Sequence, residues 1–212
     1  MFIKKPRSLS VGVLVMSLLL SRDVIASDWN LKKSKENIQA YTQEVPGHAQ
    51  LAFRGVTTMT GTVDELIAIH RNVSSMPRWL YTCYDPIIVE NERDDSRIIY
   101  MKNKTPLFVS ERDLVLRQKI IKDSDSHASI MLTGLPDKYP KQKGFVRINY
   151  FEGSWDFNQV EPNKVRVEYK GVIDPSGALP AIATNMMVVD TPYESLRALR
   201  DYLTKTKQSA SR

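Results

Sequence analysis

The sequence predicts an α+β fold in which one antiparallel sheet is closed by a long C-terminal helix. Between residues 86 and 172, extended apolar segments alternate with short polar turns, which indicates successive β-hairpins. From Ile182 to Leu203, apolar residues recur every three or four positions, which is typical of a helix with one buried stripe. A sheet closed by a terminal helix can enclose a cavity, so the predicted fold suggests a buried ligand.

Residues 1–26 have the pattern of a secretory signal peptide. A basic segment precedes an almost uninterrupted apolar run, Leu9–Leu20, which is short for a membrane span, and a cleavage site is expected before Ser27. We therefore expect an exported protein, periplasmic or secreted, whose mature chain is residues 27–212. An uncleaved N-terminal anchor is the alternative.

The composition of the mature chain suits one globular domain that is long enough to bury a sizeable core. Removing the predicted signal lowers the formal net charge from +6 to +3, and the remaining basic residues are spread along the chain. This excludes a concentrated nucleic-acid footprint. Cys83 is the single cysteine, so no intrachain disulfide can form, and we expect a small buried apolar residue there rather than a reactive thiol.

The mature chain begins with three predicted elements: a short amphipathic helix at Trp29–Ile38, and strands at Tyr41–Val45 and Ala49–Thr60. Thr62 and Glu65 then have the spacing of a capping box, which predicts the start of a second helix. His70 falls on the apolar face of that helix. We expect it to be packed and hydrogen-bonded rather than functional.

Six further strands are predicted as three hairpins with polar turns. They are expected at Pro86–Asn91, Ser96–Asn103, Phe108–Lys122, Ala128–Leu135, Phe145–Phe157 and Val165–Val172. In the last of these, Val165, Val167 and Tyr169 alternate with charged residues. That alternation is typical of a sheet with one face packed on the core and the other exposed to solvent.

The predicted C-terminal helix divides into two halves. Its apolar stripe consists of Ile182, Met186, Val189, Tyr193, Leu196, Leu199 and Leu203. Flexible methionines in the first half suit an adaptable contact surface or plain core, whereas leucines in the second half suit fixed packing. Pro192 interrupts the pattern and predicts a kink, or a restart near Thr191. Gly177 and Pro180 are expected in the turn that leads into the helix.

Several motifs in one order carry a family resemblance. They are Trp79 after a short helix, Val89-Glu90 before Arg97-Ile98-Ile99-Tyr100, TPLFVSERDLVLRQ at 105–118, KQKGFVRINYFEGSW at 141–155, and YKGVIDPSGALP at 169–180. Together they resemble the START domain, the lipid-transfer fold related to steroidogenic acute regulatory protein, over about Trp29–Leu203. The resemblance implies a helix-grip fold, in which a curved antiparallel sheet wraps around a long C-terminal helix and encloses a tunnel for one hydrophobic molecule.

The resemblance also implies a monomer that binds a lipid and contacts membranes transiently, without catalytic residues, metal, cofactor or nucleic acid. Amphipathic aromatic residues suit the orientation of a head group, although ordinary core is the alternative for each. The expected ligand-binding residues are Trp79, Tyr100, Arg117, Tyr150, Trp155, Tyr169, Ile182, Met186 and Val189.

Two arginines on one predicted strand receive different interpretations. Arg112 and Asp113 match the family's Arg-Asp pair and are interpreted as structural. Arg117 resembles the family's cavity arginine, but it comes one residue early, which turns the side chain to the other face unless a bulge absorbs the shift. No acidic partner for Arg117 is evident on the strand Ile98–Lys102. An unpaired buried arginine favours an anionic or phosphate-bearing ligand over a sterol.

Two other function classes stay open. One is an enzyme of the helix-grip superfamily, although the sequence has no G-x-S-x-G motif, no P-loop and no metal-ligand spacing among His48, His70 and His127. The other is a periplasmic scaffold with a filled core. A cavity of roughly several hundred Å³ would favour ligand binding, and a packed interior would favour the scaffold.

Overall fold

The computed structural model describes residues 29–45, 51–106, 108–174, 176–177 and 179–210. The predicted signal peptide, residues 1–26, lies outside these residues, as does part of the predicted strand Ala49–Thr60. Within the described ranges, no helix has the length and apolar character needed to cross a lipid bilayer.

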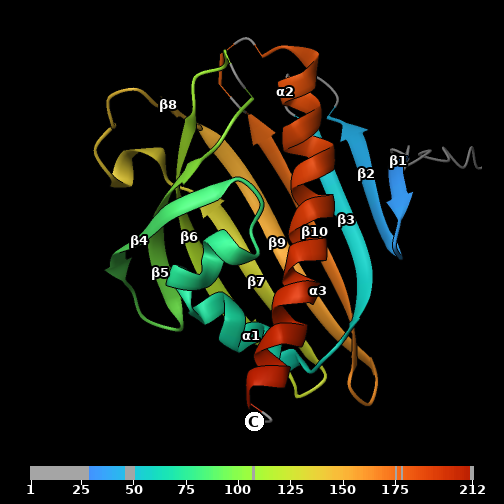
Figure 1. Cartoon of the computed structure of the whole chain (residues 1–212). Helices are drawn as coiled ribbons and strands as arrows, with labels where there is room; N and C mark the ends of the chain where they lie inside the picture. The colour runs from blue at the N-terminus through green and yellow to red at the C-terminus, as the bar shows by residue number, and fades with distance from the viewer. Residues whose placement is uncertain (1–28, 46–50, 107, 175, 178, 211–212) are drawn as a thin grey trace, which may run out of the picture.

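One curved sheet forms the body of the described chain (Figure 1). Its strands follow the order β1-β2-β3-β10-β9-β7-β6-β5-β4, and all neighbours on this path are antiparallel. A short strand, β8, pairs in parallel with β6. The strands are β1 Asn30–Lys35, β2 Ile38–Glu44, β3 Leu51–Thr60, β4 Cys83–Asn91, β5 Ser96–Asn103, β6 Arg112–Lys122, β7 His127–Gly134, β8 Val146–Arg147, β9 Tyr150–Glu161 and β10 Lys164–Asp174.

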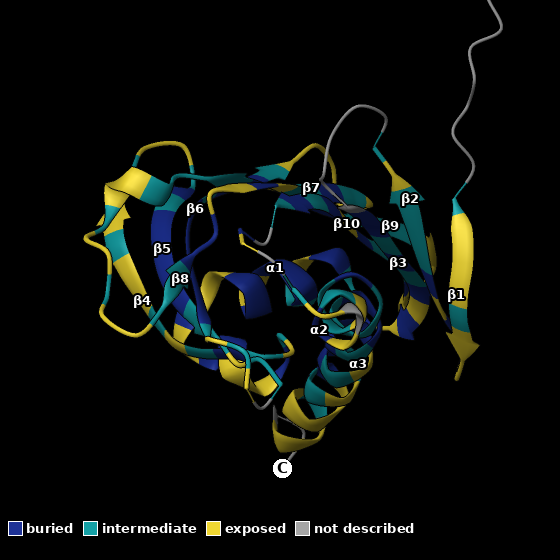
Figure 2. Cartoon of the chain, turned by 90° about the horizontal axis from the view of Figure 1, so that it is seen from above, coloured by how far each residue is buried: buried dark blue, intermediate teal, exposed yellow. Residues whose placement is uncertain are grey.

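The sheet curves around the helices, which fill its concave side (Figure 2). These are α1 Val63–Arg71, a 3₁₀ turn at Val73–Arg78, α2 Ala181–Asn185, a π-helical segment at Met186–Asp190, and α3 Thr191–Ala210; a second 3₁₀ turn, Pro136–Lys138, lies before β8. Leu196, Leu199 and Leu203 of α3 are completely or almost completely buried in the core. Gly55 on β3 allows this close approach, because a Cβ atom there would lie 2.8 Å from the Leu196 Cδ1. The predicted architecture of an antiparallel sheet around a long C-terminal helix is confirmed.

Local signals predicted several details correctly. Thr62 and Glu65 form the expected capping box at the start of α1, with both reciprocal hydrogen bonds present. His70 is 1% exposed, its Nδ1 lies 2.9 Å from the Leu66 carbonyl oxygen, and its ring packs on Trp79 and Trp155. Burial lowers the pKa of His70 to about 4. The histidine is therefore a neutral part of the core, as predicted.

Cys83 is also buried as expected, and desolvation raises the pKa of its thiol to about 12. Gly177 and Pro180 lie before α2 as expected; Gly177 has a positive φ, 73°, and Pro180 directly precedes the helix. The interruption predicted at Pro192 takes the form of the π-helical segment, after which α3 begins at Thr191. Proline has no N–H to bond a carbonyl in the preceding turn, so the regular α-helical ladder cannot run through this point.

One predicted element was wrong, and two were wrong in part. Trp29–Ile38 is not a helix: β1 and β2 form a hairpin at the edge of the sheet, and its turn residues Glu36 and Asn37 have φ values of 55° and 59°. These left-handed conformations suit a tight hairpin turn and end any helix. The predicted strand Phe145–Phe157 is divided into β8 and β9, because Val146–Arg147 pairs with β6 and β9 pairs with β7 and β10. The strand predicted from Phe108 begins only at Arg112.

Candidate functional site

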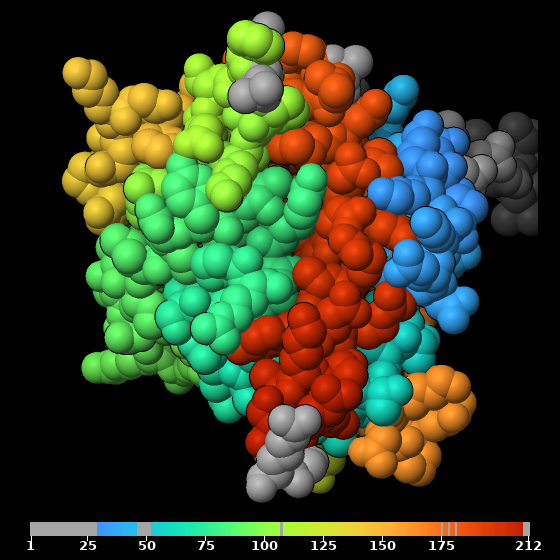
Figure 3. Space-filling model, in the orientation of Figure 1, coloured from blue at the N-terminus to red at the C-terminus, as the bar shows by residue number. Residues whose placement is uncertain are grey.

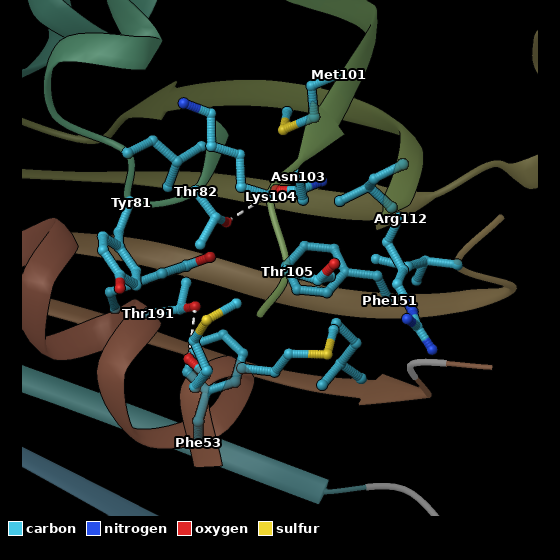
Figure 4. A pocket seen from close by; sticks show the side chains of 17 residues that line it. Phe53, Tyr81, Thr82, Met101, Asn103, Lys104, Thr105, Arg112, Phe151 and Thr191 are labelled. Carbon is cyan, nitrogen blue, oxygen red and sulfur yellow. Dashed lines mark hydrogen bonds between the residues drawn. The ribbon is translucent and has the colours of Figure 1, made fainter. Parts of the chain in front are cut away.

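An internal pocket of about 70 Å³ lies between the sheet and the first part of the C-terminal helix (Figure 4). Strands β3, β5, β6, β9 and β10 contribute side chains to its wall, and the π-helical segment closes it. The lining residues are Phe53, Leu80, Tyr81, Thr82, Met101, Asn103, Lys104, Thr105, Arg112, Leu114, Ile148, Phe151, Tyr169, Ile173, Met186, Met187 and Thr191.

A surface groove of about 560 Å³ adjoins this pocket. Six residues line both spaces and so form the wall between them: Leu80, Tyr81, Thr82, Lys104, Thr105 and Met186. The wall lies where the segment of residues 75–106, green in Figure 3, meets the orange-red C-terminal helix. We call these six residues the pocket wall.

The pocket is mostly apolar, and its charged residues are basic. Met186 and Met187 are half-buried, which distinguishes them from the fully buried leucines of α3. Among the described residues, Lys104 and Arg112 are the charged ones that line the pocket, and none of the lining residues is Asp, Glu, His or Cys. Within the described residues, no cluster of three or more such side chains is placed to hold a metal ion. The pocket therefore suits an apolar molecule with a neutral or anionic polar end.

Strand alternation explains how β6 serves two faces of the sheet. Arg112 and Leu114 line the pocket, whereas Asp113 points to the opposite face. There Asp113 accepts two hydrogen bonds from Arg147, at 2.8 Å from Nε and 2.9 Å from Nη2. Arg147 also donates to the carbonyl oxygens of Tyr139 and Pro140, so this buried ion pair fixes the chain between β7 and β8. The interpretation of the Arg-Asp pair as structural fits Asp113, but Arg112 lies at the pocket.

The structure distributes the nine predicted ligand-binding residues unevenly. Tyr169 and Met186 line the pocket, and Trp79 lines the adjoining groove. Trp155 stacks on Tyr169, with ring centroids 4.0 Å apart and an interplanar angle of 4°, but does not itself line the pocket. Val189 is half-buried against the core.

The other predicted residues lie away from the pocket. Tyr100 is buried in a second small cluster with Ile98 and Val115, which includes the ring of Tyr139 at 4.5 Å. Tyr150 is 39% exposed and Ile182 is 69% exposed, and neither lines the pocket. Ile182 belongs to the predicted apolar stripe, but α2 turns it outward and buries Ala183 instead.

Arg117 requires a correction. It does not line the pocket, and it is not unpaired: its Nε and Nη2 donate to the two carboxylate oxygens of Glu92 at 2.6 and 2.7 Å. The pairing of β5 with β6 is regular from Arg112 to Lys119, so no bulge absorbs the one-residue shift. Arg117 comes five positions after Arg112, and an odd difference in position along a strand reverses the face.

Several pocket residues were not predicted as ligand-binding: Phe53, Asn103, Lys104, Arg112, Phe151, Met187 and Thr191. The alternation of β6 was the available signal for Arg112, because it lies in phase with the buried Leu114 and Leu116. Met187 directly follows Met186 in the sequence, so the methionines of this helix half were the available signal for it. The remaining residues meet only when distant strands pair, which no local pattern indicates.

Comparison with known proteins identifies the fold. No family model matches the chain. An uncharacterized protein of Pseudomonas aeruginosa is 28% identical over 195 residues, covering 89% of this chain and 96% of that protein. A crystal structure of a STAR-related lipid transfer protein from Xanthomonas axonopodis is 29% identical, with a TM-score of 0.75 over 83% of this chain and 98% of that chain. Human StAR-related lipid transfer protein 5 has a TM-score of 0.73 at 16% identity, over 88% of this chain and 90% of that chain. The chain has the START helix-grip fold.

Proposed function

We propose that this START-fold protein binds one hydrophobic ligand between the sheet and the C-terminal helix, and transfers or sequesters it after export. The observation that carries the proposal is the apolar pocket lined by Met186 and Met187, which shares six lining residues with a surface groove. The two solved structures compared above are both described as lipid transfer proteins, which supports a lipid as the ligand. The predicted signal peptide favours the periplasm or the exterior.

The size of the pocket implies that binding requires movement. A volume of about 70 Å³ has room for about two water molecules, whereas small-molecule sites usually measure roughly 300–1,000 Å³. An acyl chain must therefore displace the pocket wall. Met186 and Met187 are suited to this, because methionine adapts its shape easily, and they lie in a π-helical segment instead of a regular helix. Each methylene group buried contributes about 0.8 kcal/mol toward binding.

The lining of the pocket favours binding over hydrolysis. A hydrolase or cyclase needs an activated nucleophile or a general acid or base near the substrate, most often His, Asp, Glu or Cys. None of these residue types is among the described residues that line the pocket. The lining groups that can also transfer a proton are Tyr81, Lys104 and Tyr169, and burial raises the pKa of Tyr169. The small volume is the observation that favours the other alternative, a scaffold with a filled interior. Ligand uptake separates that alternative from the proposal.

The experiment is to export the full chain in a bacterial periplasm, purify it, and identify bound molecules by native mass spectrometry. Purified protein is also incubated with labelled phospholipid, hexadecanoate and hexadecanol. We expect one bound hydrophobic molecule per chain. Empty protein that takes up none of these probes would overturn the proposal in favour of the scaffold.

A matched pair of variants tests where the ligand sits. Met187→Trp fills the pocket, whereas Ile182→Trp places the same side chain on an exposed position of the neighbouring turn. We expect uptake to be lost in the first variant and retained in the second, with both folded by circular dichroism. The smaller change Met187→Phe replaces Met187→Trp if the latter does not fold. Equal uptake by both variants would place the ligand elsewhere.

A further inference from the structure

Arg112 is a buried cation without an anionic partner. Its side chain lines the pocket and the residue is only 3% exposed, yet no described carboxylate lies within ion-pair distance of it. Nη1 donates to the carbonyl oxygen of Ser110, and Nη2 reaches the carbonyl oxygen of Ser176 at 3.4 Å. Nε is buried without any hydrogen-bond partner in the described structure. Burial lowers the pKa of Arg112 but leaves the guanidinium charged at neutral pH, since free arginine titrates far above it.

Two other arginines show which kind of group binds a buried or half-buried guanidinium in this protein. Arg117 and Arg147 each use Nε and Nη2 together as a fork that holds both oxygens of one carboxylate, at distances of 2.6–2.9 Å. The guanidinium fork fits planar carboxylate or phosphate oxygens in this way. In Arg112 the same fork has one nitrogen unpaired and the other only weakly bonded. A bidentate acceptor is the group that would complete it.

A second unpaired donor lines the same pocket, on the strand that pairs with that of Arg112. Asn103 is the residue directly opposite Arg112 in the pairing of β5 with β6, and it lines the same pocket. The Oδ1 of Asn103 accepts a hydrogen bond from the Thr82 hydroxyl at 3.3 Å, while its Nδ2 is buried without a partner. A buried donor left unpaired costs about 1–3 kcal/mol, so two in the lining of one pocket require an explanation. Both donors would be satisfied by the same kind of group, a compact anion.

We propose that Arg112 and Asn103 bind the anionic head group, a carboxylate or a phosphate monoester, of an amphiphilic ligand. This inference rests on the proposed function, and adds to it the chemical class of the ligand. Arg112 and Asn103 line the pocket but not the adjoining groove, whereas Met186 and Lys104 line both. In Figure 4, Arg112 lies near Phe151, whereas Asn103 lies beside Thr82 of the pocket wall. The head group therefore lies along the ends of β5 and β6, between these two side chains, and the hydrocarbon tail extends past Met186 toward the groove.

The test compares three ligands with the same sixteen-carbon tail: hexadecanoate, hexadecyl phosphate and hexadecanol. Dissociation constants are measured by calorimetry below the aggregation concentration of each ligand, for the wild type, Arg112→Gln and Arg117→Gln. Arg117→Gln is the matched control, because it makes the same change on the same strand but its fork is already filled by Glu92. Inorganic phosphate serves as the head group without a tail.

We expect the wild type to bind both anionic amphiphiles more tightly than the alcohol. Arg112→Gln weakens binding of the two anionic ligands by about 10- to 100-fold, the value of a hydrogen-bonded charge contact, and leaves alcohol binding unchanged. Arg117→Gln changes none of the affinities. Arg112→Lys, which keeps the charge without the fork, loses part of the preference and replaces Arg112→Gln if that variant does not fold.

The outcomes separate this inference from the proposed function. If the wild type binds all three ligands equally, or if Arg112→Gln weakens the alcohol as much as the anions, the head-group site is overturned while ligand binding stands. If the wild type binds none of the three, both proposals fall. If inorganic phosphate binds as tightly as hexadecyl phosphate, the site holds a free anion and the assignment to a lipid head group is overturned.

Discussion

The two halves of the C-terminal helix lie against the same sheet but cover different interiors. The packed half, Tyr193–Leu203, has Leu196, Leu199 and Leu203 at 0–1% exposure. The pocket half, residues 181–192, includes the π-helical segment, and its two methionines are only half-buried over a space that contains unpaired donors. Since the free energy of folding comes mainly from dense apolar burial, the packed half can hold the fold while the pocket half moves.

The largest expected contrast comes from shortening one apolar side chain in each half. Leu199→Ala should lower the free energy of unfolding by about 2–5 kcal/mol, because it leaves a cavity in a dense core. Met187→Ala should cost less than half as much, because this side chain already borders open space. Urea denaturation of both variants measures the difference. Equal losses would show that the two halves contribute alike and that the pocket half is not free to open.

The dense core on the concave side of the sheet, to which the packed half belongs, should also show a specific sensitivity to acid through His70 of α1. Its pKa is lowered from 6.5 to about 4 by burial, so the unfolded chain takes up a proton before the folded chain does. The contribution is fully present above pH 6.5 and declines as the pH falls toward 4, by about 3 kcal/mol in total. The stability of wild type relative to His70→Phe, measured by urea denaturation between pH 7 and 4, should fall by this amount.

His127 is the control, because its pKa is shifted in the direction opposite to that of His70. It is half-exposed on β7, and hydrogen bonds to Asp156 and Asp123 raise its pKa, so its contribution is present below pH 6.5 and is lost as the pH rises through the folded value. His127→Gln should therefore leave the acid sensitivity due to His70 unchanged. A wild-type protein whose stability relative to His70→Phe is flat over this range would show that His70 is accessible to water.

The junction of the two halves can be tested at Gly55. A Cβ atom at this position would lie 2.8 Å from Leu196 Cδ1 and 3.1 Å from Pro192 Cβ, closer than packed carbon atoms normally approach. Gly55→Ala should lower the free energy of unfolding by about 1–3 kcal/mol, with Thr58→Ala on the exposed side of the same strand as the control. If Gly55→Ala is as stable as the control, the helix can lift from the sheet at the junction without cost.

The packed half is also the part that sequence reasoning predicted best. Its leucine stripe depends on neighbours three or four residues away, and such spacings can be seen in the sequence. The same holds in α1 for the capping box at Thr62 and for the buried His70. The edge hairpin of β1 and β2 was missed because its turn depends on two left-handed residues, Glu36 and Asn37, instead of on glycine. The helical and strand periodicities of the sequence therefore predicted the architecture, but not the hairpin at the edge of the sheet.

The pocket next to the pocket half was predicted less well, because the residues that line it come from distant strands. Arg117 was expected at the ligand site but lies on the other face of the sheet. Regular alternation along β6 turns Arg112 toward the pocket and Arg117 toward Glu92. Tyr100 went to the opposite face of the sheet. Phe53, Asn103 and Phe151 meet at the pocket only through the order β3-β10-β9-β7-β6-β5, which a single sequence does not reveal.

The smallest expected effect concerns the cost of keeping Arg112 charged inside the ligand-free pocket. Arg112→Met removes a buried cation without a counter-ion, at the loss of two hydrogen bonds to carbonyl oxygens, so the free energy of unfolding should stay level or rise by up to about 1 kcal/mol. Arg117→Met breaks a half-exposed ion pair and should instead lower it by up to about 1 kcal/mol. Urea denaturation of both variants without ligand gives the signs. A loss of several kcal/mol in Arg112→Met would mean that its bonds to Ser110 and Ser176 hold the strand in place. Arg112 would then be a structural residue like Asp113 and Arg147. The pocket would no longer contain a charged group that is free to bind a ligand.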